Sequence, residues 1–176
     1  ITLKEMEKGI NWEDKDKLIE MEKNTEIEFI TNSEYKVIMD GKDVSKEIRD
    51  EIISKNTKYI ASILEIREIL WEKQRKYREK FNIVMEGRDI GSKVFPDAEI
   101  KIYLDASVDE RAKRRYLQLK EMKIEEDIEK IKKDVIKRDD VDRKREIATL
   151  LKMPDAEYID TTNLTIEQVV NKICSI

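Results

Sequence analysis

Hydrophobic and polar positions along this chain change their period several times, and each change predicts a new element. The first 22 residues or so have the apolar spacing of helices, with a break at Gly9. Residues 27–30 and 35–39 are short β-like runs, and Asp40-Gly41 after the second run is typical of a hairpin turn. We expect a small antiparallel unit here, too small to be stable alone and therefore an insertion on a larger body.

A longer helical pattern runs from about Asn56 to about Lys80. Arg67 falls inside its apolar stripe, where an unpaired charge would be very costly to bury. Arg67 therefore either binds an anionic or hydrogen-bonding partner or extends its stem until the guanidinium reaches solvent, and the pattern leaves both open. The apolar residues on or near this face are Ile60, Ile63, Leu64, Leu70 and Trp71.

The second half of the chain alternates apolar strands with helices. Residues 83–85, 100–104 and 156–160 predict strands. Capping sequences at Ser107 and Thr165 predict the starts of two helices. Strand, helix, strand and helix in this order are typical of an α/β fold in which helices pack on a parallel sheet.

A charged loop, residues 87–91, follows the first of these strands. Open α/β sheets bind ligands at the carboxyl ends of their strands. We expect Gly87 and Gly91 to permit a tight turn and a close ligand approach. Arg88 can bind a phosphate through two hydrogen bonds, and Asp89 can accept hydrogen bonds from an amino group. The same pair could instead only tie a surface loop.

The helix expected over residues 125–145 changes character along one face. Apolar residues at a 3,4 spacing give way to charged residues at the same spacing, so a core stripe becomes a polar line. Such a helix is built to close over a polar ligand, although it could also simply emerge into solvent. Along this line lie Ile128, Ile131, Val135, Arg138, Asp142 and Arg145.

A second basic set begins soon after the predicted cap at Ser107. Arg111, Arg114 and Arg115 share one helical face. A solvated basic face is the usual reason for such a trio, yet three guanidinium groups beside a nucleotide cleft could also hold phosphate oxygens.

Composition narrows the chemistry. With 36 basic and 40 acidic residues the net charge is −4, which argues against a general nucleic-acid or anionic-membrane surface. The absence of histidine excludes Ser-His and Cys-His pairs and histidine-bound metals, and the single Cys174 excludes an internal disulfide. No apolar run approaches a membrane span. We expect one domain over residues 1–176, located in the cytoplasm, with catalysis by carboxylates, lysines, arginines or a bound metal.

Several long motifs occur in a fixed order. They are Glu86-Gly87-Arg88-Asp89-Ile90-Gly91, Val94-Phe95-Pro96-Asp97-Ala98-Glu99, Asp105-Ala106-Ser107, Arg114-Arg115-Tyr116, Lys137-Arg138-Asp139-Asp140 and Asp160-Thr161-Thr162. Together they resemble the bacterial cytidylate kinases, which are nucleoside-monophosphate kinases of the P-loop class. The resemblance covers essentially the whole chain.

This resemblance implies a parallel-sheet P-loop kinase core with flanking helices. It also implies a small antiparallel β insert at residues 24–60, which binds the monophosphate, and a short helical lid at residues 116–146. The implied reaction moves the γ-phosphate of ATP to CMP or dCMP, with Mg²⁺. The implied partners are therefore CMP, dCMP and ATP, with no nucleic acid and no membrane, and we expect a monomer.

The resemblance also implies roles for individual residues. Arg67 and Asp89 contact the cytosine ring, and Arg138 and Asp142 contact the sugar. Arg88 and Arg145 contact the acceptor phosphate and are the catalytic candidates. We expect these six side chains to converge on one cleft. Tentative contacts to the ATP phosphates come from Arg111, Arg114 and Arg115, no metal ligand is assigned, and a third base contact near Lys58 has no match.

The family's phosphate-binding loop, Gly-x-x-x-x-Gly-Lys-Ser/Thr, has no match in the sequence. None of the four glycines precedes Lys-Ser or Lys-Thr. That loop supplies the backbone N–H groups, the phosphate-binding lysine and the hydroxyl that binds Mg²⁺. We expect it, with the first strand, to precede Ile1, and we expect these 176 residues alone to show negligible turnover of ATP.

Two other functions remain open from the residues. The chain could be a nucleotide-binding or protein-interaction module without catalysis, since it has no P-loop. RNA binding through the three arginines is weaker, because RNA readers usually interleave basic residues with exposed aromatic ones and the net charge here is negative.

Overall fold

The computed structural model describes residues 1–30, 34–144 and 151–176. The chain divides into two compact units, Ile1–Asn82 (unit 1) and Ile83–Ile176 (unit 2). Each unit has its own buried apolar cluster. Among the described residues, no helix has the length and apolar character needed to cross a bilayer.

Unit 1 opens with two short helices, α1 (Thr2–Lys8) and α2 (Lys15–Lys23). Gly9 ends α1 in the left-handed conformation, with φ 61°, which glycine adopts without steric cost. The Asp14 side chain accepts a hydrogen bond from the Lys17 N–H and so caps α2. The predicted break at Gly9 is confirmed.

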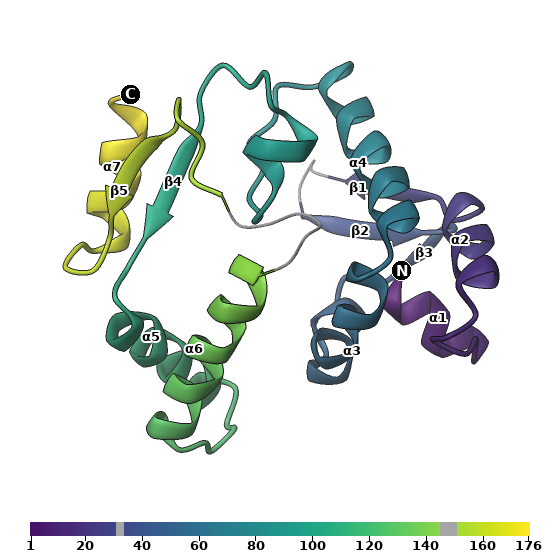
Figure 1. Cartoon of the computed structure of the whole chain (residues 1–176), viewed down its shortest axis with the longest axis horizontal. Helices are drawn as coiled ribbons and strands as arrows, with labels where there is room; N and C mark the ends of the chain where they lie inside the picture. Colours follow the sequence, from purple (N-terminus) through teal and green to yellow (C-terminus); the bar gives the residue numbers. More distant parts are fainter. Residues whose placement is uncertain (31–33, 145–150) are drawn as a thin grey trace. The chain divides into compact units, whose positions relative to one another are not determined.

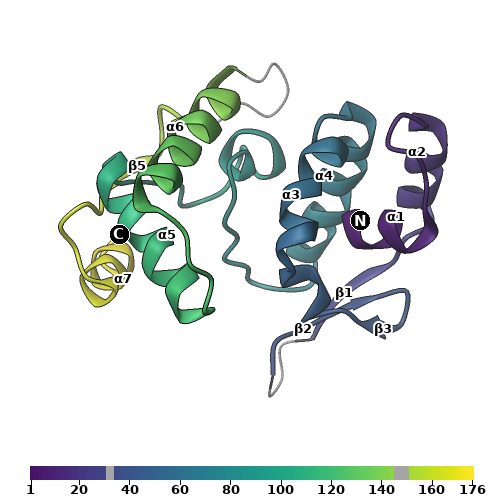
Figure 2. The same cartoon turned by 90° about the horizontal axis from the view of Figure 1, so that it is seen from below.

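A three-stranded antiparallel sheet follows, with β1 (Ile27–Ile30), β2 (Lys36–Met39) and β3 (Lys42–Asp43) in that order (Figure 2). Asp40 and Gly41 both have positive φ, 49° and 80°, and Met39 pairs with Lys42 across them. Two positive φ angles are the signature of the two-residue hairpin turn that Asp-Gly favours. The predicted hairpin is therefore confirmed.

The prediction of one continuous helix from about Asn56 to Lys80 is wrong, because the structure has two helices here. A 3₁₀ turn (Glu47–Arg49) leads into α3 (Glu51–Ala61), and a separate helix, α4 (Leu64–Arg78), follows. The Ser62 hydroxyl donates to the Tyr59 carbonyl at 2.7 Å, and Ile63 is extended. This break turns the chain so that residues on both sides of it enter one core. That core consists of Leu18, Met21, Ile60, Ile63 and Ile66.

Unit 2 is built on a parallel pair of strands, β4 (Ile102–Asp105) and β5 (Glu157–Asp160) (Figure 1). Ser107 caps α5 (Val108–Glu121) by accepting a hydrogen bond from the Glu110 N–H. Thr165 and Gln168 form a reciprocal capping box at the start of α7 (Ile166–Cys174). The predicted α/β order and the parallel pairing are confirmed.

The helix α6 (Ile128–Lys144) packs beside α5 (Figures 1 and 2). Their shared core contains Ala112, Leu119 and Ile131, with Val135 packed against it. Ile128 is outside this core and 41% exposed, so its predicted place on the buried face is wrong. As the first residue of α6, Ile128 has no preceding turn of the helix to cover it.

The strand expected at residues 83–85 is not formed. Val84 is fully exposed, and among the described residues β4 is hydrogen-bonded only to β5. An apolar run becomes a strand only when a neighbour satisfies its backbone N–H and C=O groups. The apolar pattern of residues 83–85 was therefore not sufficient to predict a strand.

Candidate functional site

The loop at residues 87–91 continues into a π-helical turn, Ile90–Val94. The carbonyl of Asp89 accepts hydrogen bonds from the N–H groups of Lys93 at 2.8 Å and Val94 at 3.3 Å. Val94 and Phe95 are buried, so they anchor the turn. Single π-helical turns are often found at functional sites, and this one holds the backbone of Asp89 in place.

We expected Gly87 and Gly91 to permit a tight turn, but the backbone of this loop does not require glycine at either position. Neither Gly87 nor Gly91 has a positive φ, so neither is needed for a left-handed turn. A Cβ atom at Gly87 would come within 2.7 Å of Ile90 Cγ1, whereas one at Gly91 would meet only ordinary contacts, the nearest at 3.6 Å. Gly87 is therefore required because the Ile90 side chain occupies the space beside it.

Arg88 and Asp142 form an ion pair between this loop and α6. Asp142 is only 3% exposed, and the neighbouring Asp89 is 8% exposed. A buried carboxylate needs a charged or hydrogen-bonding partner, and the guanidinium of Arg88 supplies it. The sequence placed both residues in the site, and the structure brings them together.

Of the other residues of the expected cleft, Arg138 and Arg67 are each described within their own unit. Arg138 is exposed on α6, one turn before Asp142. Arg145 lies outside the described residues. Arg67 is half-buried on α4 of unit 1, where its Nη1 donates to the Ala61 carbonyl at 3.3 Å and its Cζ lies 5.7 Å from the centre of the Trp71 ring. Convergence of all six residues stays a prediction.

A buried polar cluster fixes α4 within unit 1. The Lys73 ammonium donates to the Glu22 carboxylate and to the Thr25 carbonyl, both at 2.8 Å. Burial raises the pKa of Glu22, and the hydrogen bond from Lys73 acts in the opposite direction. Lys73 thus ties the helix that carries Arg67 to the end of α2.

Arg111 is held by a residue that the sequence did not single out for its chemistry. Its guanidinium reaches both carboxylate oxygens of Asp139, at 2.8 and 2.7 Å, and its Nε donates to the Ala106 carbonyl at 2.9 Å. The hydrogen bond from Arg111 lowers the pKa of Asp139, and the same bond raises the pKa of Arg111. This two-point pair joins α5 to α6.

Arg114 and Arg115 also bond to protein groups. Arg114 donates to the Thr161 carbonyl at 2.6 Å, and this bond ties α5 to the end of β5. Arg114 also donates to Glu110 of the same helix at 2.8 Å. Arg115 is exposed and donates to Gln118 at 2.8 Å. In the described conformation Arg111 and Arg114 hold unit 2 together. Arg114 and Arg115 are exposed, whereas Arg111 is half-buried.

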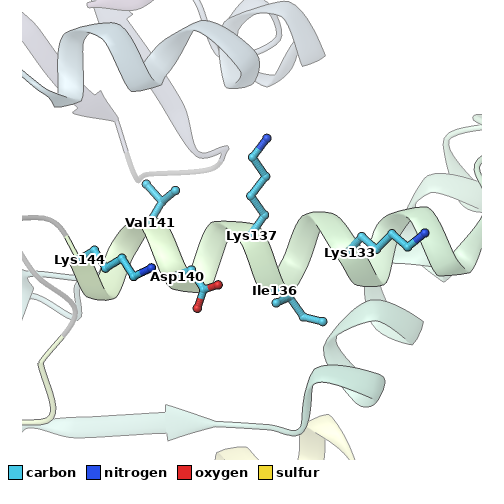
Figure 3. A pocket seen from close by; sticks show the side chains of 6 residues that line it. All are labelled: Lys133, Ile136, Lys137, Asp140, Val141 and Lys144. Atoms are coloured by element: carbon cyan, nitrogen blue, oxygen red, sulfur yellow. The ribbon is translucent and has the colours of Figure 1, made fainter.

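One pocket on unit 2 contains none of the predicted site residues. Figure 3 shows that its six lining side chains all come from α6, and they include Asp140, Val141 and three lysines. At 100° per residue, Asp140 lies about 160° around the helix from Asp142. This groove is therefore on the opposite face of α6 from the ion pair with Arg88.

Relatives with known names match the chain along its length. A family model described as Cytidylate kinase matches residues 1–176. A cytidylate kinase of Alkaliphilus oremlandii is 44% identical over 176 residues, which are 100% of this chain and 80% of the relative. One from Caldanaerobacter subterraneus subsp. tengcongensis is 43% identical over 173 residues (98% and 76%), and one from Bacillus cereus is 39% identical over 177 residues (100% and 79%).

These similarities agree with the ordered motifs and with the parallel strand pair described above. The family model matches the full chain, and the three relatives are about 40% identical to it over at least three quarters of their own length. One short shared motif could not produce a match of this length. The chain belongs to the cytidylate kinase family.

Proposed function

We propose that this protein transfers the γ-phosphate of ATP to CMP or dCMP. The observation that carries the proposal is the Arg88–Asp142 pair, in which a phosphate-binding guanidinium and a hydroxyl-binding carboxylate meet beside the loop of residues 87–91. A nucleoside monophosphate offers the two matching groups, since its phosphate is anionic and its sugar hydroxyls are hydrogen-bond donors.

Base recognition rests on Arg67 and Asp89. The cytosine ring has an exocyclic amino group, which donates to a carboxylate, and it has acceptor atoms at N3 and O2, which accept from a guanidinium. A half-buried arginine and a buried aspartate can supply these two complementary contacts. Arg138 and Asp142 contact the sugar.

Arg88 and Arg145 act on the acceptor phosphate. Phosphoryl transfer requires little covalent work from the protein, so catalysis consists of alignment and stabilisation of charge. A guanidinium bound to the acceptor phosphate can hold it in line and stabilise the negative charge that develops on its oxygens during transfer.

ATP and Mg²⁺ are the remaining components of the reaction. Arg111, Arg114 and Arg115 are the proposed contacts for ATP phosphates. When bound, Mg²⁺ would neutralise negative charge on the nucleotide phosphates. Within the described part of the chain there is no group of three or more acidic, histidine or cysteine side chains that could hold a metal ion, so no residue is assigned to Mg²⁺.

The organisation expected from the sequence is part of the same proposal. Residues 24–60 form the insert that binds the monophosphate, residues 116–146 form the lid, and the chain acts as one kinase domain. The hydrogen-bonded hairpin and the α5–α6 pair support these two assignments. A cytoplasmic location and a monomeric state stay predictions.

A substrate panel tests the proposal. The protein as its gene encodes it is assayed with ATP and each of CMP, dCMP, AMP and GMP at equal concentrations. We expect faster formation of ADP with CMP or dCMP than with AMP or GMP. Equal rates with all four would overturn the substrate assignment, and binding of CMP without any turnover would support the non-catalytic alternative.

A further inference from the structure

We propose that Trp71 is a positioning residue for Arg67, and that its indole ring sets how strongly the protein prefers cytosine to uracil. The inference rests on the proposed function, because it concerns how Arg67 reads the base. It concerns unit 1 alone, and it uses an aromatic side chain that the sequence pattern had treated only as part of an apolar stripe.

Two contacts restrain the guanidinium of Arg67. Its Cζ lies 5.7 Å from the centre of the Trp71 ring, which is within the distance at which a cation is attracted to the face of an aromatic ring. Its Nη1 donates to the Ala61 carbonyl at 3.3 Å. One contact comes from the next turn of α4 and the other from the end of α3, so the group is held from two directions.

The groups that supply these contacts are themselves fixed. Ile60, Ile63 and Ile66, which lie on both sides of the break between α3 and α4, are buried in the core of unit 1. Further along α4, Lys73 bonds to Glu22 and Thr25. Ala61 and Trp71 are therefore carried by backbone that cannot shift easily, and Arg67 is ordered before a ligand arrives.

A held guanidinium distinguishes the two pyrimidines better than a mobile one. The N–H donors of a guanidinium lie in its plane, so attraction to a ring face does not compete with the hydrogen bonds that these donors make. Cytosine presents acceptors at N3 and O2, whereas uracil has an N–H group at position 3 that opposes a donor. A mobile Arg67 could avoid this clash by bonding to O2 alone, and the preference for CMP would then decrease.

Substitution of Trp71 tests the inference in the full protein. We expect W71L to weaken CMP binding by about three- to tenfold, and to lower the ratio of CMP to UMP affinity, because a contact between a cation and an aromatic ring is lost. The KM for CMP should rise while kcat and the KM for ATP stay near their original values. W71F keeps an aromatic face and should retain most of the CMP preference.

Trp12 provides the matched control. It packs on Tyr59 with ring centroids 5.1 Å apart, also in unit 1, and W12F should leave the CMP to UMP ratio unchanged. Within these 176 residues, which contain two tryptophans, W12F leaves only Trp71. Addition of CMP to W12F should change the tryptophan emission, and R67K in the same background should reduce that change.

The outcomes separate this inference from the proposed function. One outcome is that the unaltered protein binds CMP and R67K weakens this binding, whereas W71L changes neither the CMP affinity nor the ratio of CMP to UMP affinity. In that case the proposed role of Trp71 is wrong and the kinase proposal stands. If W71L and W71F reduce CMP and UMP affinity equally, Trp71 only supports packing and the inference is also wrong. If the unaltered protein does not bind CMP, the proposed function is wrong, and the inference that rests on it is wrong as well.

Discussion

Arg88 and Asp142 are two charged residues of unit 2 that satisfy each other. In the described structure Asp142 is almost fully buried and its carboxylate pairs with the guanidinium of Arg88. If CMP binds as proposed, its phosphate takes over Arg88 and its sugar hydroxyls donate to Asp142. The pair offsets the cost of burying the Asp142 carboxylate, which would be large for an isolated charge.

At Asp142 we predict that D142A weakens CMP binding by about 1–3 kcal/mol, the range for a hydrogen bond that involves a charged group. The affinity for ATP should change less. Isothermal titration calorimetry with CMP and with ATP measures both. D140A is the matched control, because Asp140 lies on the opposite face of α6 and loses the same charge. Equal losses of CMP affinity in the two variants would contradict the assignment.

At Gly87 we predict that G87A lowers the free energy of unfolding by about 1–3 kcal/mol, the usual cost of crowding a packed site. The added methyl group would lie 2.7 Å from Ile90 Cγ1. Urea unfolding measures the effect. G91A should cost clearly less, because its Cβ would have only ordinary contacts and no left-handed conformation to strain. The explanation is wrong if G91A costs as much as G87A.

Between elements, the contact that orients α6 is the two-point pair of Arg111 and Asp139. It joins α6 to α5 on the side where the two helices share their apolar core. Asp142 sits one turn after Asp139 on α6, so this pair also helps to place the carboxylate that meets Arg88. Arg111 and Asp139 therefore position α6 against α5.

The Arg111–Asp139 pair predicts a specific pH dependence of stability. Folding lowers the pKa of Asp139 below its ordinary value of 3.8, so the ionised carboxylate stabilises the folded chain above that pH. This contribution is lost as the pH falls below 3.8 and through the lower pKa of the folded state. The stability difference between the unaltered protein and D139N should therefore be larger at about pH 6 than at about pH 3.

Urea unfolding of both proteins at the two pH values measures this difference. D109N is the control, because Asp109 pairs with Lys132 across the same two helices but is exposed, and exposed pairs contribute little. A stability difference for D139N that does not change with pH would refute the link between the carboxylate and the stability of the α5–α6 pair.

At the scale of the whole molecule, two apolar clusters organise two compact units. Leu18 is fully buried in the cluster of unit 1, and Leu119 is buried in that of unit 2. The helix that carries Arg67 is anchored in the first cluster, and the helix that carries Asp142 is anchored in the second. The stability of each cluster therefore determines how well the proposed binding residue on its helix is held.

A pair of core substitutions tests this division. L18A should cost about 2–5 kcal/mol of stability through the cavity that it leaves, and L119A should cost a similar amount. Native-state hydrogen exchange, followed on peptides, should show lost protection mainly in residues 1–82 for L18A and mainly in residues 83–176 for L119A. Equal loss along the whole chain in both variants would instead support one cooperative domain.

By itself, the sequence determined the features that depend on neighbouring residues. The break at Gly9, the Asp-Gly turn and the caps at Ser107 and Thr165 were all predicted and are present. Local backbone preferences and side-chain spacing act within one or two turns of the chain, so they can be read without the fold. The ordered motifs likewise identified the family, which the full-length match confirms, and they led to the prediction that Arg88 and Asp142 are site residues.

Tertiary structure alone decided the features that depend on distant residues. The sequence did not show that Arg111 would be held by Asp139, 28 residues away, or that Gly87 is needed because of the Ile90 side chain. It predicted a continuous helix where the core requires a break at Ser62, and a strand at residues 83–85 where no strand neighbour is present in the described part of the chain. Ion pairs, core packing and strand pairing each need a partner whose position only the folded chain supplies.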